Sequence, residues 1–199
     1  MSAPQTDFPS EPRSSTADRI LDCAQAQIQR RGYNAVSYGD LAEELDLTTT
    51  AIHYHFPSKA DLGQALVRRY RRTNKQARAV IWDEADSLRG RLEKYVESYV
   101  GLMEGGGLCL CGVLSSEAST LPEAVRQEVR AFFQEQEDWL TTVIGARTSH
   151  VGGLSGCESP RDTAQVVLAA IEGAMLTTPD RSGEAYAATL QHLVDSVVT

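Results

Sequence analysis

A run of polar side chains in the first third of the chain carries the clearest chemistry. Residues 48–59 read TTTAIHYHFPSK and supply hydroxyl groups, imidazoles, a phenol ring and a lysine ammonium. Such groups form hydrogen bonds with the base edges and phosphates of nucleic acids. On a short helix Ala51 and Ile52 are the expected inward residues. The side chains that would then face outward are Thr49, Thr50, His53 and Tyr54.

A second candidate lies in the middle of the chain, where Cys109 and Cys111 follow the glycine run 105–107. On one helix, side chains two positions apart point about 200° away from each other. A helical pair could therefore neither ligate one metal nor close a disulfide, whereas an extended pair would lie on one side. Three interpretations stay open: buried core thiols, a thiol sensor of oxidants or electrophiles, and a metal sensor. Further metal ligands would come from His150, Cys157 and His192.

The elements that position the polar run are predicted from repeated helix caps. A serine stands three positions before an aspartate at Ser15, Ser37 and Ser58, which is typical of a helix start. The first helix would end at Gly32. Asp46 tolerates the left-handed conformation that a sharp turn after Leu45 requires. Thr48 would cap the next helix, which Phe56 and Pro57 end, so the layout is that of a helix-turn-helix.

Charge is divided unevenly along the 199 residues. Residues 1–80 carry 11 Lys and Arg against 9 Asp and Glu, while residues 81–199 carry 8 against 18. The second part would repel DNA, so any contact with DNA should be local and made by the first part. The alternative is that the uneven charge is only a solvated surface. Six cations in the run 68–78 form either a nucleic-acid patch or a set of ion pairs with the acidic part, and we favour the ion pairs.

Composition argues against several classes of protein. The chain shows neither a signal-peptide pattern nor an apolar run long enough for a membrane span, so we expect a cytoplasmic protein with reduced cysteines. Residues 1–13 contain three prolines and few apolar groups, which predicts a disordered arm. No acid pair, phosphate loop or Cys/His pairing supports an enzyme, and no cofactor is predicted. A thiol-dependent enzyme built on Cys109 or Cys111 is a remote alternative.

The remainder of the chain is predicted to be helical throughout, with no strand pattern. The helix from Ser58 should run to about Gln76. The other expected helices cover 81–103, 109–119, 122–144, 161–177 and 182–198, with a loop over 145–160.

The run from Arg19 to Leu66 resembles the DNA-binding domain of the TetR family of bacterial repressors. The resemblance rests on RILDCA, RRGYNAVSYGDLAEEL and AIHYHFPSKADLGQAL. It implies an all-α fold of about nine helices, with a helix-turn-helix domain over 14–60 and an effector-binding and dimerisation domain over 61–199. The chain departs from the family pattern at Thr49, where many members carry a lysine, and in the order His53, Tyr54.

The resemblance also implies partners: double-stranded operator DNA, a small-molecule effector and a second copy of the chain, paired through the last two helices. The function implied is that of a ligand-responsive repressor. The expected DNA-contacting residues are Ser37, Tyr38, Thr48, Thr49, Thr50, His53, Tyr54 and Lys59. The candidates for an effector cavity, with plain core as the alternative, are Tyr95, Tyr99, Met103, Cys109, Cys111, Phe132, Phe133, Trp139, Glu172 and Met175.

Overall fold

The computed structural model describes residues 15–146, 154, 156–178 and 183–199, and these form nine helices and no strand. The prediction of an all-α fold is therefore confirmed. The helices are α1 (Thr16–Arg31), α2 (Tyr38–Leu45), α3 (Thr49–His55), α4 (Lys59–Glu84), α5 (Leu88–Glu104), α6 (Leu110–Ser116), α7 (Glu123–Gly145), α8 (Pro160–Thr177) and α9 (Gly183–Val198).

The first helices begin at the predicted caps. The hydroxyl of Ser37 accepts a hydrogen bond from the backbone N–H of Asp40 at 3.2 Å, and Ser58 caps α4 in the same way. Asp46 ends α2 with φ 53° and ψ 48°, the left-handed conformation that the turn needs. These local bonds satisfy N–H groups that a helix start leaves without partners. They therefore fix where short helices such as α2 begin.

Two predicted boundaries in the middle of the chain were wrong. Helix α4 continues past Gln76 to Glu84, and the helix expected over 81–103 starts only at Leu88. No proline or glycine interrupts the chain near Gln76, so the helix continues, and Ile81 is buried against the interior. The break comes at Ala85, whose backbone is extended, and Ser87 caps α5 through Gly90.

Helix α6 is shorter than predicted, covering Leu110–Ser116 rather than 109–119, with Cys109 as its N-cap residue. The remaining helices lie within a residue or two of their expected ends. The predicted arm over 1–13, His150 and part of the loop predicted over 145–160 lie outside the described residues.

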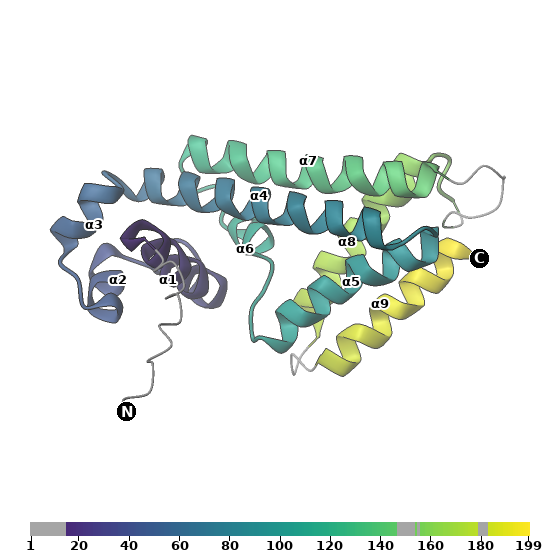
Figure 1. The fold of residues 1–199 in the computed structure, drawn as a ribbon, viewed down its shortest axis with the longest axis horizontal. Helices are drawn as coiled ribbons and strands as arrows, with labels where there is room; N and C mark the ends of the chain where they lie inside the picture. The colour runs from purple at the N-terminus through teal and green to yellow at the C-terminus, as the bar shows by residue number, and fades with distance from the viewer. Residues whose placement is uncertain (1–14, 147–153, 155, 179–182) are drawn as a thin grey trace, which may run out of the picture.

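Helices α1 to α3 form one end of the molecule, which we call the head, and α5 to α9 form the body (Figure 1). Helix α4 runs from the head along α7, while α5 lies beside α9. Buried apolar residues form one continuous core from Ile20 in α1 to Val197 in α9. The domain boundary predicted at residue 60 thus stays a prediction. No described helix is long and apolar enough to cross a membrane.

Candidate functional site

Helix α3 presents the polar run at the surface of the head. Ile52 is fully buried and anchors the helix, while Thr49, Thr50 and His53 are exposed and Tyr54 is 84% exposed. Thr48 caps the helix, with its hydroxyl accepting the N–H of Ala51 at 3.1 Å. Helix α3 has seven residues, of which Ile52 is buried, and polar side chains cover its outward side. A helix of this kind can lie in a groove of DNA.

Tyr38 has a different environment from Tyr54 although both were expected to contact DNA. Its hydroxyl donates to the carbonyl oxygen of Phe56 at 2.8 Å, and its ring lies edge-on to His53 with centroids 4.6 Å apart. Burial raises the pKa of Tyr38 to about 12, so the phenol stays protonated. Tyr38 therefore braces α2 against the end of α3.

Lys59 opens α4 at the edge of the head. Its ammonium lies 4.4 Å from the centre of the Tyr33 ring and 3.5 Å from the carbonyl oxygen of Asn34. Burial lowers the pKa of Lys59, and the carboxylates of Glu117 and Asp40 oppose that effect. The side chain is half-buried at a helix N-terminus, a position that favours an approaching phosphate.

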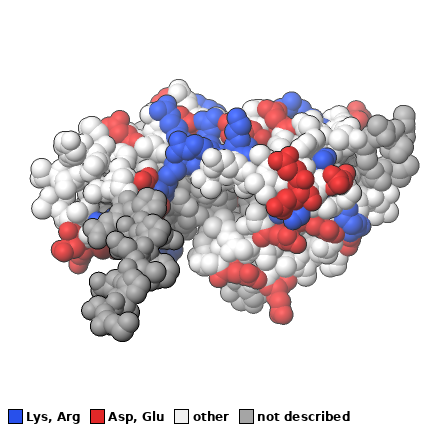
Figure 2. Space-filling view, in the orientation of Figure 1, with Lys and Arg blue, Asp and Glu red and all other residues white. Residues whose placement is uncertain are grey.

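The basic run on α4 is mostly paired with acidic side chains. Arg69 forms an ion pair with Asp22 of α1 at 2.8 Å. Arg68 and Arg71 both contact Glu128 of α7, and Arg71 and Arg78 contact Glu135. These contacts fit the ion-pair interpretation of the run. On the face seen in Figure 2, acidic side chains are spread over the body.

Comparisons with known proteins agree with this geometry. Residues 20–66 match the family model described as bacterial regulatory proteins, tetR family. A TetR-family transcriptional regulator from Agrobacterium tumefaciens is 31% identical, with a TM-score of 0.85 over 92% of this chain and 97% of that chain. This chain belongs to the TetR family.

Other solved structures agree with the TetR assignment. A TetR transcriptional regulator from Legionella pneumophila is 28% identical, with a TM-score of 0.85 over 94% of this chain and 98% of that one. A transcriptional regulator from Saccharomonospora viridis in complex with choline is 23% identical, with a TM-score of 0.76 over 92% and 97%, and shows the shared fold alone. No curated protein sequence matches the chain significantly. TetR-family proteins are transcription regulators and generally not enzymes.

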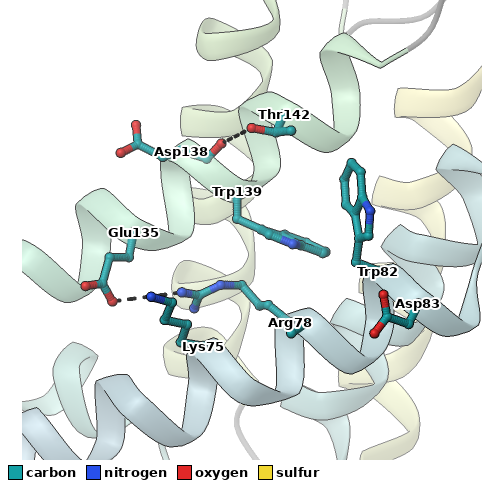
Figure 3. Close-up of a pocket in the computed structure, with 9 residues that line it drawn as sticks. Lys75, Arg78, Trp82, Asp83, Glu135, Asp138, Trp139 and Thr142 are labelled. Carbon is teal, nitrogen blue, oxygen red and sulfur yellow. Dashed lines mark hydrogen bonds and ion pairs between the residues drawn. The ribbon is translucent and has the colours of Figure 1, made fainter.

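Helices α4 and α7 line a cleft of about 500 Å³. Trp82 of α4 and Trp139 of α7 project into it, and Arg78 lies below them (Figure 3). The full lining, which we call the α4–α7 cleft, is Lys75, Arg78, Ala79, Trp82, Asp83, Glu135, Asp138, Trp139 and Thr142.

Of the predicted effector residues, the α4–α7 cleft contains Trp139 only. The Tyr95 ring packs on the Trp139 ring, with the two ring centroids 5.1 Å apart. The hydroxyl of Tyr95 donates to the side-chain oxygen of Gln136 at 3.3 Å. Trp82 is not among the residues predicted from the sequence, because a helix boundary near Gln76 separates it from the helix that starts at Ser58. An unbroken helix would have put these two residues on one face, since they are four positions apart.

The other candidates are packed in the interior. Tyr99, Met103, Cys109, Cys111, Phe132 and Met175 are each 5% exposed or less. Phe133 is half-buried against the core. That these residues bind an effector stays a prediction.

Glu172 of α8 places a carboxyl beside the thiol of Cys109. One of its oxygens is buried without a hydrogen-bond partner, and burial raises the pKa of the carboxyl. Burial, with Glu172 nearby, holds the pKa of Cys109 well above its ordinary value, and burial does the same for Cys111. Such thiols stay protonated and shielded, which favours the core interpretation over the sensor interpretation. Among the described residues, no three His, Cys, Asp or Glu side chains are placed to hold a metal.

Proposed function

We propose that the protein is a repressor that leaves a palindromic operator when a small molecule enters the α4–α7 cleft. The observation that carries this proposal is the continuity of α4, whose 26 residues include Lys59 at the head and Arg78 and Trp82 at the cleft. Such a helix spans about 39 Å without a break. A ligand that tilts the cleft end of α4 against α7 must therefore move the head end of α4.

The DNA contacts proposed for the head are those of α3 and the start of α4. Thr49, Thr50, His53 and Tyr54 would enter the major groove, while Lys59 would meet a phosphate. Two copies of the chain would place two heads on successive half-sites, and an effector that changes their spacing would lower affinity by coupling between the two sites.

The ligand proposed for the cleft is a small molecule with both apolar and hydrogen-bonding parts. Its apolar part would lie against the two indole rings, and its polar groups would meet the carboxylates and cations of the rim. The related regulator from Saccharomonospora viridis was crystallised with choline, so a small molecule binds to a protein of this fold.

Tryptophan emission tests the proposal directly, because the chain has two tryptophans and both line the cleft. A duplex is first selected from a randomised palindromic pool by the wild-type protein, and is called the selected duplex below. Fractions of a small-molecule extract are then tested for both release of the selected duplex and a change in emission. We expect the two effects to follow the same concentration dependence.

Single Trp82→Phe and Trp139→Phe variants assign the emission change to each ring. A compound that releases the selected duplex while leaving both emissions unchanged would place the effector elsewhere.

A further inference from the structure

At the end of α6, the carboxylate of Glu117 contacts the head. Oε2 of Glu117 accepts hydrogen bonds from the backbone N–H groups of Tyr33, at 2.7 Å, and Asn34, at 3.2 Å. Gly32 makes this approach possible, since a Cβ there would lie 2.6 Å from Oε1 of Glu117. The φ of Gly32 is also +85°, which few other residues adopt. A body side chain thus satisfies two donors in the turn between α1 and α2.

Two further bonds flank this carboxylate. The side-chain amide of Asn34 donates to the hydroxyl of Thr120 at 2.7 Å, just beyond α6. The side-chain amide of Gln29 donates to the carbonyl oxygen of Leu108 at 2.6 Å, just before α6. The two ends of α6 are therefore bonded to the last turns of α1 and to the turn that follows it, by bonds that join residues about 80 positions apart in the chain.

The turn that Glu117 holds also positions Lys59. The hydroxyl of Tyr33 donates to the carbonyl oxygen of Lys59 at 2.9 Å, and the Tyr33 ring lies under the ammonium. Asn34 offers that ammonium its carbonyl oxygen. The ring is held against α4 because Gly63 leaves room for it, where a Cβ would lie only 2.9 Å from the ring. Tyr33 and Asn34 thus connect Glu117 to the first turn of α4.

The start of α6 is anchored in the body. The N–H of Cys109 lies 3.0 Å from the sulfur of Met175 in α8, and Cys109, Leu110 and Cys111 are buried. A side-chain rearrangement in this interior would displace α6, because close-packed interiors transmit strain. Glu117 lies at the other end of the same short helix, so it would move as well.

We propose that Glu117 is a positioning residue that couples α6 to Lys59. By holding the Tyr33–Asn34 turn, it keeps the lysine where a DNA phosphate would meet it. This coupling is a second connection from body to head, separate from the length of α4. It rests on the proposed contact between Lys59 and DNA.

Amide hydrogen exchange tests the contact without any DNA. In Glu117→Ala the N–H groups of Tyr33 and Asn34 lose their acceptor, and we expect them to exchange on the order of tenfold faster. Glu117→Gln keeps an acceptor oxygen in place and should retain most of the protection. Glu123→Ala, which removes an exposed carboxylate at the start of α7, is the matched control and should leave both amides unchanged. Unchanged exchange in folded Glu117→Ala would overturn the proposal.

A double-mutant cycle on the selected duplex tests the coupling to Lys59. We expect Lys59→Ala to weaken binding in the wild-type background and to weaken it severalfold less in the Glu117→Ala background. Glu117→Gln should restore the full effect of Lys59→Ala. Strictly additive losses, or no loss from Lys59→Ala, would overturn the coupling. Wild-type protein that selects no duplex would contradict the proposed function, and the exchange experiment would still decide the contact.

Discussion

Tyr38 and Tyr54 show how two residues of one type in one motif acquire different roles. Tyr54 is 84% exposed on α3, whereas the Tyr38 hydroxyl is held by the Phe56 carbonyl oxygen. An exposed side chain adds little to the stability of the fold and is free to contact a partner, while a hydroxyl bonded within the protein supports the fold. The two tyrosines can therefore be separated by experiment.

Tyr54→Ala should leave the free energy of unfolding within about 0.5 kcal/mol of wild type. It should weaken binding to the selected duplex by roughly tenfold and reduce discrimination against altered half-sites. Denaturant unfolding and titration of labelled duplexes measure the two quantities.

Tyr38→Phe is the matched variant, expected to cost about 1 kcal/mol of stability through the lost hydrogen bond. Retained sequence discrimination in Tyr54→Ala would show that α3 is not the surface that contacts the bases.

The four cysteines differ in access to solvent. Cys23, Cys109 and Cys111 are buried and Cys157 is partly exposed. Burial raises the pKa of each of the three buried thiols, which removes the reactive thiolate at neutral pH. We expect a thiol reagent at pH 7 to modify one cysteine of the native protein rapidly and the other three only after unfolding.

Cys157→Ser is the control and should abolish the fast phase. Rapid modification of Cys109 in the folded protein, accompanied by release of the selected duplex, would instead support the thiol-sensor alternative.

At the scale of elements, α4 is attached to α7 by a row of ion pairs. Glu128 is central to it, because its carboxylate meets both Arg68 and Arg71. Burial opposes ionisation of Glu128, but hydrogen bonds from the two arginines outweigh it and hold the pKa below its ordinary value. The stabilisation is therefore present above the unfolded pKa, about 4.3, and is lost as the pH falls through the folded pKa.

Glu128→Gln should lower the free energy of unfolding by about 2 kcal/mol at pH 7. The difference from wild type should shrink below about pH 4, where the wild-type carboxyl also becomes neutral. Denaturant unfolding at several pH values measures this.

A difference between the two proteins that stays constant down to pH 3 would show that Glu128 acts by packing and not by its charge. Glu123→Gln, which alters an exposed ion pair at the start of α7, is the control and should change stability little at any pH.

At the scale of the molecule, α8 carries an apolar strip on its outer face. Leu176 is 66% exposed and Val166 45%, and Ala169 and Gly173 lie between them at helical spacing. A Cβ on Gly173 would meet nothing within 4 Å, so a neighbouring helix could approach closely there. This strip supports the proposed homodimer through α8 and α9.

Leu176→Arg should convert the dimer into a monomer in sedimentation experiments and weaken binding to the selected duplex, because the two heads would no longer be linked. Val80→Arg is the control, since Val80 is 52% exposed on α4 and lies outside the strip. A dimer that survives Leu176→Arg would place the interface elsewhere.

Local sequence was sufficient to predict the helices of the head and the family to which the chain belongs. Helix caps at Ser37 and Ser58, the left-handed Asp46 and the outward side of α3 depend on residues within a few positions of each other, so their spacing predicts them. The end of α4 was predicted too early, because the cations near Gln76 do not end the helix; of these cations, Arg71 and Arg78 pair with α7.

Contacts between distant residues were decided by the tertiary structure alone. The α4–α7 cleft joins Trp82 to Trp139, and Glu117 reaches Tyr33 across more than 80 positions. Neither pair leaves a periodic signal in the chain, because each depends on how whole helices pack. The polar run 48–59 by itself thus identified a surface that could contact DNA. The proposal of what could move that surface depends on tertiary structure, in which α4 packs along α7 and Glu117 contacts the turn between α1 and α2.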